Sequence, residues 1–165
     1  MFNIGDKIVY PMHGVGTIET IEEKDICGDV EDYYIIKMDV DGVKAMVPTA
    51  KATNVGIRHI ANIDSVDNVF NILNEEVEEL VNDTNWSKRY LANCEKIKAG
   101  HIEDVAKVYK DLSIRHNVKG LAVGEKKMLT TCKNILISEL AILKNESYEM
   151  LDKEIEDIVT NHCEV

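Results

Sequence analysis

The spacing of apolar residues changes once along this chain of 165 residues, close to residue 60. Before that point, segments such as residues 17–22 alternate polar and apolar side chains, as a half-buried strand does. After it, apolar residues recur every three or four positions, which is the period of an amphipathic helix. A helix built on the alternating pattern would have no single apolar face, and neither would a strand built on the helical pattern. We therefore expect an α+β protein with a β module at 1–58, a linker at 59–64 and an all-α helical bundle at 65–165.

Turn-forming residues divide the β module into four or five short strands. Asp41-Gly42 is a strong hairpin signal between segments 33–38 and 43–47. Pro48 ends the second of these segments, because proline has no N–H to give to a ladder. So many short strands in so short a module indicate a small, strongly bent sheet or barrel.

Apolar stripes predict five helices in the second half of the chain. Gly100 is expected to end the second helix and Ser147 to cap the last one. In the second helix we expect four residues to face inward, namely Tyr90, Leu91, Cys94 and Ile97. The stripes run over residues 66–81, 86–97, 102–112, 128–143 and 151–162.

The charge of the chain is unevenly distributed. The net charge of −11 argues against nucleic-acid binding. By segment, however, residues 1–83 carry −11, residues 84–135 carry +6 and residues 136–165 carry −6. A polyanion responds to the local field within roughly 10 Å, the screening length at about 0.1 M salt. The cationic middle segment can therefore meet nucleic acid with one face.

Several functional classes find no support in the sequence. The four cysteines form no Cys-x-x-Cys pair, so we expect no metal and no redox dithiol. Cys94 and Cys132 lie on apolar stripes, and we expect buried, reduced thiols in a reducing cytosol. The scattered histidines form no catalytic constellation, so we expect no enzyme and no cofactor. No apolar run approaches the roughly 20 residues that cross a bilayer, which predicts a soluble cytoplasmic protein.

The only tryptophan opens the cationic segment, in the run Asn85-Trp86-Ser87-Lys88-Arg89-Tyr90. Spacing alone favours two readings of Trp86 equally, a residue of the bundle core and a ligand-contacting residue. The polar neighbours Asn85, Lys88 and Arg89 suit phosphates and sugars. An aromatic side chain at a helix start can also insert against a base step. The local charge therefore favours nucleic acid.

A second cationic pair follows the segment 119–125, which is similar to a phosphate loop only superficially. That loop needs four residues between its glycines and then Lys-Ser/Thr, whereas Gly120 and Gly124 are separated by three and Glu125 follows. We interpret the segment as an inter-helix turn. Lys126 and Lys127 then lie in the first turn of the longest helix, where they either bind phosphate or form a solvated face.

Together these residues resemble the CarD/CdnL family of bacterial transcription regulators, whose N-terminal module is shared with the transcription-repair coupling factor. The matching runs occur in order over nearly the whole chain. They are Gly5-Asp6-Lys7-Ile8-Val9-Tyr10-Pro11 with His13-Gly14, Val47-Pro48, Asn85-Trp86-Ser87-Lys88-Arg89-Tyr90 with Ala92-Asn93, and Gly120-Leu121 with Gly124-Glu125-Lys126.

The resemblance implies a Tudor-like module that binds the RNA polymerase β subunit, and a helical module that contacts promoter DNA at the upstream edge of the bubble. It implies that Trp86 is a minor-groove wedge that stabilises the open complex without reading a specific sequence. Lys88 and Arg89 would contact phosphates, and Asn85, Lys126 and Lys127 are further expected DNA-binding residues. The expected polymerase-binding residues are Lys24, Lys44, Met46, Val47 and Pro48.

Two positions depart from the family pattern. Met46 stands where an arginine often contacts the polymerase, leaving Lys44 and Lys24 as substitutes, and Leu91 stands where another cation is common. The net charge of −11 and the missing cation at Leu91 favour an alternative, a protein-only adaptor that binds polymerase or another partner through the β module without significant DNA binding. Polymerase binding by strand addition would tolerate the first departure, because backbone hydrogen bonds do not depend on side-chain charge. We expect a monomer, with a strand-swapped dimer as the alternative.

Overall fold

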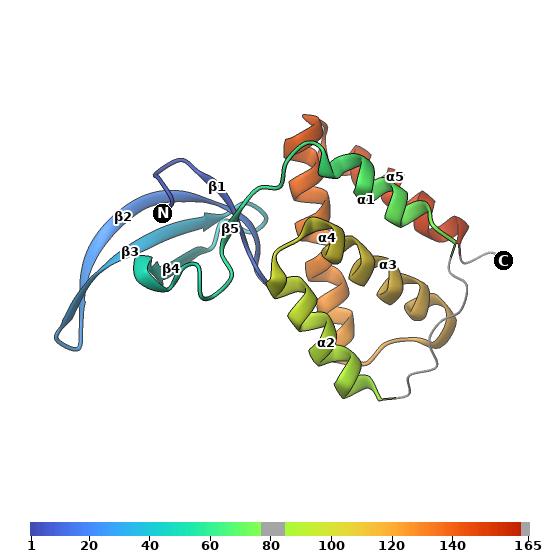
Figure 1. Cartoon of the computed structure of the whole chain (residues 1–165), viewed down its shortest axis with the longest axis horizontal. Helices are drawn as coiled ribbons and strands as arrows, with labels where there is room; N and C mark the ends of the chain where they lie inside the picture. The colour runs from blue at the N-terminus through green and yellow to red at the C-terminus, as the bar shows by residue number, and fades with distance from the viewer. Residues whose placement is uncertain (77–84, 163–165) are drawn as a thin grey trace. The chain divides into compact units, whose positions relative to one another are not determined.

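The first unit of the protein is an antiparallel five-stranded sheet (Figure 1). The computed structural model describes residues 1–76 and 85–162, and it divides into two units, Met1–Ile60 and Ala61–Val165. The strand order is β4-β3-β2-β1-β5, with a short 3-10 turn at Thr49–Lys51 after β4. The strands are β1 (Lys7–Tyr10), β2 (Gly14–Ile26), β3 (Asp29–Met38), β4 (Lys44–Pro48) and β5 (Arg58–His59).

The pairing of β2 with β3 has two local features, a β-bulge and a close approach of the two strands at a glycine. The register shifts between Ile18 and Thr20, so Glu19 is an extra residue in β2, and such a bulge bends a strand and increases its twist. A Cβ on Gly16 would lie 2.9 Å from Ile36 Cγ2, so only glycine fits there. The inner face packs a continuous core of Phe2, Ile8, Ile18, Tyr34, Ile36, Met38, Val47, Ala52 and Ile57.

The strand predictions are largely confirmed. The hairpin at Asp41-Gly42 is present, with Gly42 at φ 68° and Met38 N donating to Val43 O at 2.9 Å. The turn at Gly28 is also present, but β2 and β3 extend up to it and are longer than the alternating pattern predicts. In this outer part of the hairpin nearly all residues are exposed on both faces, so burial imposes no alternation there.

The second unit contains five helices within the described residues. They are α1 (Ser65–Asn74), α2 (Trp86–Ala99), α3 (Ile102–Lys119), α4 (Val123–Lys144) and α5 (Tyr148–Asn161). Gly100 ends α2 in the left-handed conformation, as predicted. Ser147 caps α5, since its hydroxyl accepts a hydrogen bond from Met150 N at 3.3 Å. The α+β fold is thus confirmed, and the sheet is consistent with a Tudor-like module.

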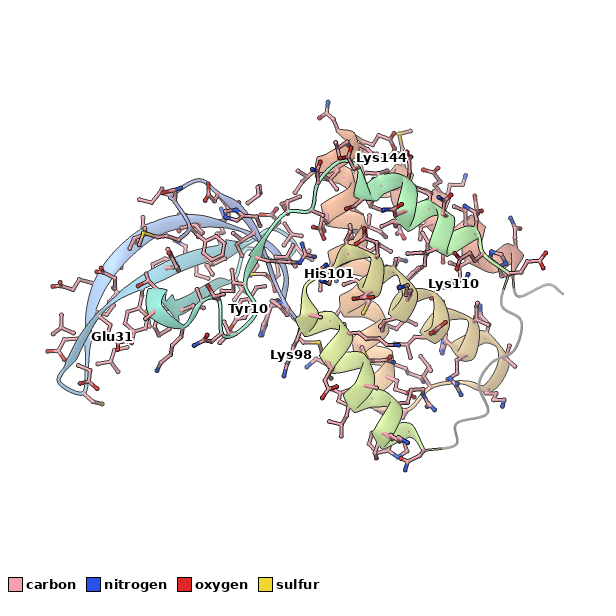
Figure 2. The ribbon with its side chains drawn as sticks, in the orientation of Figure 1. Tyr10, Glu31, Lys98, His101, Lys110 and Lys144 are labelled. Carbon is pink, nitrogen blue, oxygen red and sulfur yellow. The ribbon has the colours of Figure 1, made fainter. Side chains whose placement is uncertain are left out.

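The first helix differs from the prediction of a helix over 66–81. Helix α1 ends at Asn74, and residues 77–81 lie outside the described part of the chain. Lys110 of α3 lies at this end of α1 and is buried (Figure 2). Its ammonium donates to the carbonyls of Ile72, at 2.8 Å, and of Glu75. A lysine contributed by another helix therefore satisfies the last carbonyls of α1.

The prediction that Leu91 faces inward is wrong, because 64% of the residue is exposed. Asn93 and Ile97 are the buried residues of α2, and they lie on one face with Tyr90 at spacings of three and four. Leu91 lies about 100° around the helix from Tyr90, outside that face. Partner helices decide which face is packed.

The thiols are less uniformly buried than predicted. Cys132 is fully buried, which raises the pKa of its thiol to about 12, and Cys94 is partly buried. Cys27 is exposed in the β2–β3 turn, and Cys163 lies outside the described residues. Within the described part of the chain, no helix is long and apolar enough to span a bilayer.

Candidate nucleic-acid interface

Trp86 is the first residue of α2 and lies at the surface. The Asn85 side chain caps the helix, because its Oδ1 accepts a hydrogen bond from Lys88 N at 3.2 Å. This cap starts the helix at the indole, which is 52% exposed. A tryptophan of the bundle core would be buried, so the exposure excludes the core reading. The side chain is available to a partner.

The beginnings of α2 and α4 lie at the same end of the helical unit (Figure 1). The Tyr90 ring packs on Gly124, where a Cβ would lie 3.5 Å from the ring carbon Cε2. Next to this contact, Arg89 Nε lies 2.6 Å from Glu125 Oε1. The positive ends of two helix dipoles therefore meet at one place, which favours anions.

Three exposed lysines belong to these first turns, namely Lys88 of α2 and Lys126 and Lys127 of α4. We call Trp86 and these three lysines, which lie at the beginnings of α2 and α4, the indole–lysine surface. The Cys94 thiol raises the pKa of the neighbouring Tyr90 phenol, so that phenol adds no negative charge there. The surface offers an aromatic face, cations and helix N-termini, which are the elements that hold a nucleic-acid backbone.

Arg89 occupies a different environment from the lysines. Its side chain is only 17% exposed, and that of Glu125 is 1% exposed. The sequence predicts that Arg89 contacts a phosphate, and Glu125 is there only the residue that breaks a phosphate-loop pattern. No local pattern predicts the pairing of Arg89 with Glu125, because 36 residues separate the two. A glutamate at the third position of a helix, where it can reach back to the cap, was the available signal.

Four of the five residues predicted to bind polymerase lie on β4, at one end of the strand order, whereas Lys24 lies on β2. Met46 is 49% exposed and pairs in register with Ile35, whereas Val47 is 3% exposed and packs in the sheet core. Val47 can therefore meet a partner only through its backbone. Lys44 and Lys24 are ion-paired with Glu19 and Glu22, at 2.5 and 2.6 Å.

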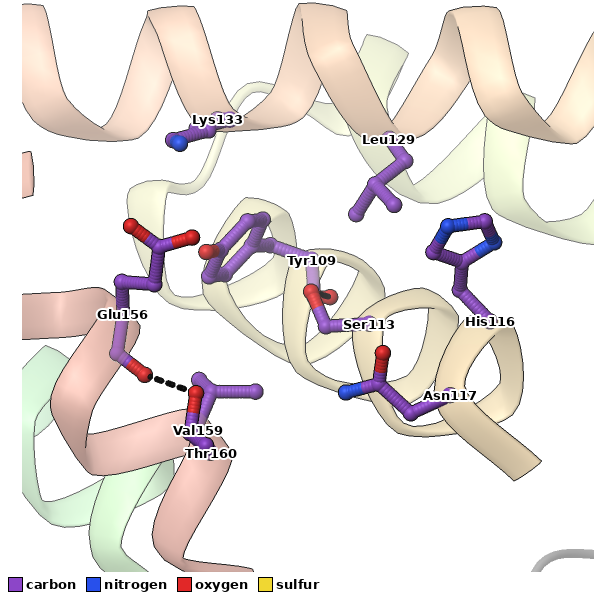
Figure 3. Close-up of a pocket in the computed structure, with 9 residues that line it drawn as sticks. All are labelled: Tyr109, Ser113, His116, Asn117, Leu129, Lys133, Glu156, Val159 and Thr160. Atoms are coloured by element: carbon purple, nitrogen blue, oxygen red, sulfur yellow. Dashed lines mark hydrogen bonds between the residues drawn. The ribbon is translucent and has the colours of Figure 1, made fainter. Parts of the chain in front are cut away.

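A hollow of about 210 Å³ lies between α3, α4 and α5 (Figure 3). Three of its polar side chains are engaged inside the protein. The Ser113 hydroxyl donates to Tyr109 O, the Thr160 hydroxyl donates to Glu156 O, and Lys133 pairs with Asp152 at 2.8 Å. Burial also raises the pKa of Tyr109, which keeps its phenol neutral. We assign no ligand to this hollow.

Comparisons with known proteins identify both units. A family model described as the CarD-like/TRCF RID domain matches residues 2–61, and one described as the CarD C-terminal domain matches residues 68–156. The chain is also 41% identical over 145 residues to "Putative transcription factor YdeB" of Bacillus subtilis (strain 168), covering 87% of this chain and 93% of that protein. These matches define a two-module transcription factor with an RNA polymerase-interacting domain. The chain belongs to the CarD family.

Proposed function

We propose that this protein is a non-enzymatic regulator that joins the RNA polymerase β subunit to promoter DNA and stabilises the open complex. The exposed Trp86 at the start of α2 carries the proposal. The indole acts as a wedge in the minor groove at the upstream edge of the bubble. Lys88, Lys126 and Lys127 hold the adjacent phosphates without reading a base sequence.

A partly inserted indole would oppose rewinding of the DNA at the edge of the bubble. Unstacking one base step costs a few kcal/mol, which is offset by the contacts that the bent DNA makes with the protein. The lysines and helix N-termini supply such contacts in the same surface. The DNA affinity of this surface can be weak, because attachment to polymerase raises its effective concentration at the promoter.

The sheet unit would supply that attachment through β4. We infer strand addition along this edge, which needs backbone groups rather than side-chain charge. That mode fits the residues present, because Lys44 and Lys24 are already paired with glutamates and Met46 offers an apolar contact. Val47 and Pro48 would shape the backbone of the contact.

A protein-only adaptor is the second candidate function. The net charge of −11 and the apolar Leu91 at the surface of α2 favour it. DNA contacts make log affinity fall with log salt, with a slope of about 0.9 per phosphate neutralised. The affinity of an adaptor for its protein partner would not fall with salt in this way, because no phosphates are neutralised.

Open-complex lifetime with matched RNA polymerase tests the proposal. Trp86→Ala should lose the lengthening of lifetime that the wild type gives, while keeping its fold and its binding to polymerase. Leu91→Ala is the matched control, because it removes another exposed apolar side chain from α2 and should keep the effect. Equal lifetimes with wild type and Trp86→Ala would contradict the wedge. If neither protein acts although both bind polymerase, the adaptor is the better description.

A further inference from the structure

The ion pair between Arg89 and Glu125 lies largely out of solvent. Arg89 Nε is 2.6 Å from Glu125 Oε1, and the two side chains are 17% and 1% exposed. A carboxylate taken out of water is costly unless a cation and hydrogen bonds compensate it. Arg89 supplies that compensation in the folded protein. Its guanidinium is therefore already committed to a partner inside the chain.

Glu125 connects this pair to the beginning of α4. Its other oxygen, Oε2, accepts a hydrogen bond from Ala122 N at 3.4 Å, just before the helix starts. A negative charge in the first turn also interacts favourably with the helix dipole. One buried carboxylate thus joins Arg89 of α2 to the cap of α4. The packing of Tyr90 on Gly124 supports the same junction.

We propose that Arg89 is a positioning residue that acts through Glu125 and not a phosphate-contacting residue. It holds the first turn of α4 against α2, and so keeps Lys126 and Lys127 beside Trp86. This inference rests on the proposed DNA contact, because it specifies how the indole–lysine surface is assembled. It reassigns one of the two cations of the tryptophan motif, and leaves Lys88 as the phosphate ligand from α2.

The two roles of Arg89 predict opposite signs for a change at Glu125. If Arg89 contacts phosphate directly, Glu125 only weakens the local positive field, and Glu125→Gln raises DNA affinity. If Arg89 acts through Glu125, the same change releases the junction and lowers DNA affinity although it removes a negative charge. Arg89→Lys keeps the cation but loses the planar guanidinium that reaches Glu125.

The test measures binding of the full chain to a fluorescently labelled fork duplex by anisotropy, over a series of salt concentrations. Glu125→Gln and Arg89→Lys should each weaken binding by about tenfold or more, the lower end of what one charge-assisted hydrogen bond contributes. The double variant should be no weaker than either single one. Glu95→Gln is the control for a lost negative charge, because Glu95 is an exposed carboxylate of α2, and it should not weaken binding. Tighter binding by Glu125→Gln, or unchanged binding by Arg89→Lys, would overturn the proposal.

Amide hydrogen exchange provides a readout without DNA. Lys126 N donates to Ala122 O at 3.0 Å in the first turn of α4. This amide should exchange about tenfold faster in both variants, while that of Leu151 in α5 stays unchanged and shows that the unit is folded. Unchanged exchange at Lys126 would refute the positioning role, whatever the DNA result. If the wild type shows no salt-dependent DNA binding, the proposed function is refuted. The hydrogen-exchange result would then still test whether Arg89 and Glu125 hold the first turn of α4.

Discussion

Lys110→Met should destabilise the helical unit strongly, because methionine keeps the length of the side chain but donates no hydrogen bond. The Lys110 ammonium donates to the carbonyls of Ile72 and Glu75 at the end of α1. Burial lowers the pKa of this lysine, so part of the energy of the two bonds is offset by desolvation. The carbonyls would lose their donor in the variant.

The expected loss in the free energy of unfolding follows from these two hydrogen bonds. A hydrogen bond to a charged group contributes about 1.5–3 kcal/mol, so two contribute roughly 3–6 kcal/mol before the desolvation of the ammonium is subtracted. We expect a net loss of about 3 kcal/mol in the free energy of unfolding. With a urea m-value of about 2 kcal/mol/M, the midpoint should fall by about 1.5 M.

Urea unfolding followed by far-ultraviolet circular dichroism and by the emission of Trp86, the only tryptophan, reports on the helical unit. Lys107→Met on the same helix is the control. Lys107 is exposed and pairs with Asp104 at 3.5 Å across one turn, a contact that contributes only about 0.5 kcal/mol. If both variants lower the midpoint equally, the capping of α1 by Lys110 does not stabilise the fold as argued.

Three further predictions concern other parts of the chain. At about pH 8, Cys27 should react with iodoacetamide in the native protein, whereas Cys132, with a pKa of about 12, should react only after unfolding; equal rates would contradict its burial. Because only the unfolded chain ionises this thiol readily, its contribution to stability should be complete below about pH 8.5 and be lost as the pH rises towards 12. Gly16→Ala should destabilise the sheet unit by about 1–3 kcal/mol in chemical denaturation, because its methyl group would overlap Ile36 and the Lys37 carbonyl. An unchanged denaturation midpoint would contradict this crowding.

The sequence alone predicts the elements of this fold where a local signal is strong. Gly100 ends α2 and Ser147 caps α5, as the sequence predicts. These signals are reliable because a cap or a turn involves residues within three or four positions of one another. The end of α1 at Asn74 has no such local signal, because Lys110 from another helix satisfies its last carbonyls.

The sequence also predicts much of the candidate site, but not its arrangement. The tryptophan motif and the lysine pair at Lys126 and Lys127 were both identified from residue type and local charge. The sequence does not show which residues of α2 and α4 meet in space. Arg89 and Glu125, for example, are 36 residues apart. The polymerase-binding and DNA-binding roles stay predictions.

Sequence by itself determined the class of each element, because backbone hydrogen bonding and apolar period are local properties. Tertiary structure decided which side chains are exposed and which are paired. It left Trp86 and Leu91 at the surface and placed Glu125 out of solvent against Arg89. The physical reason is that burial depends on what packs against a helix face, and that surface comes from distant parts of the chain.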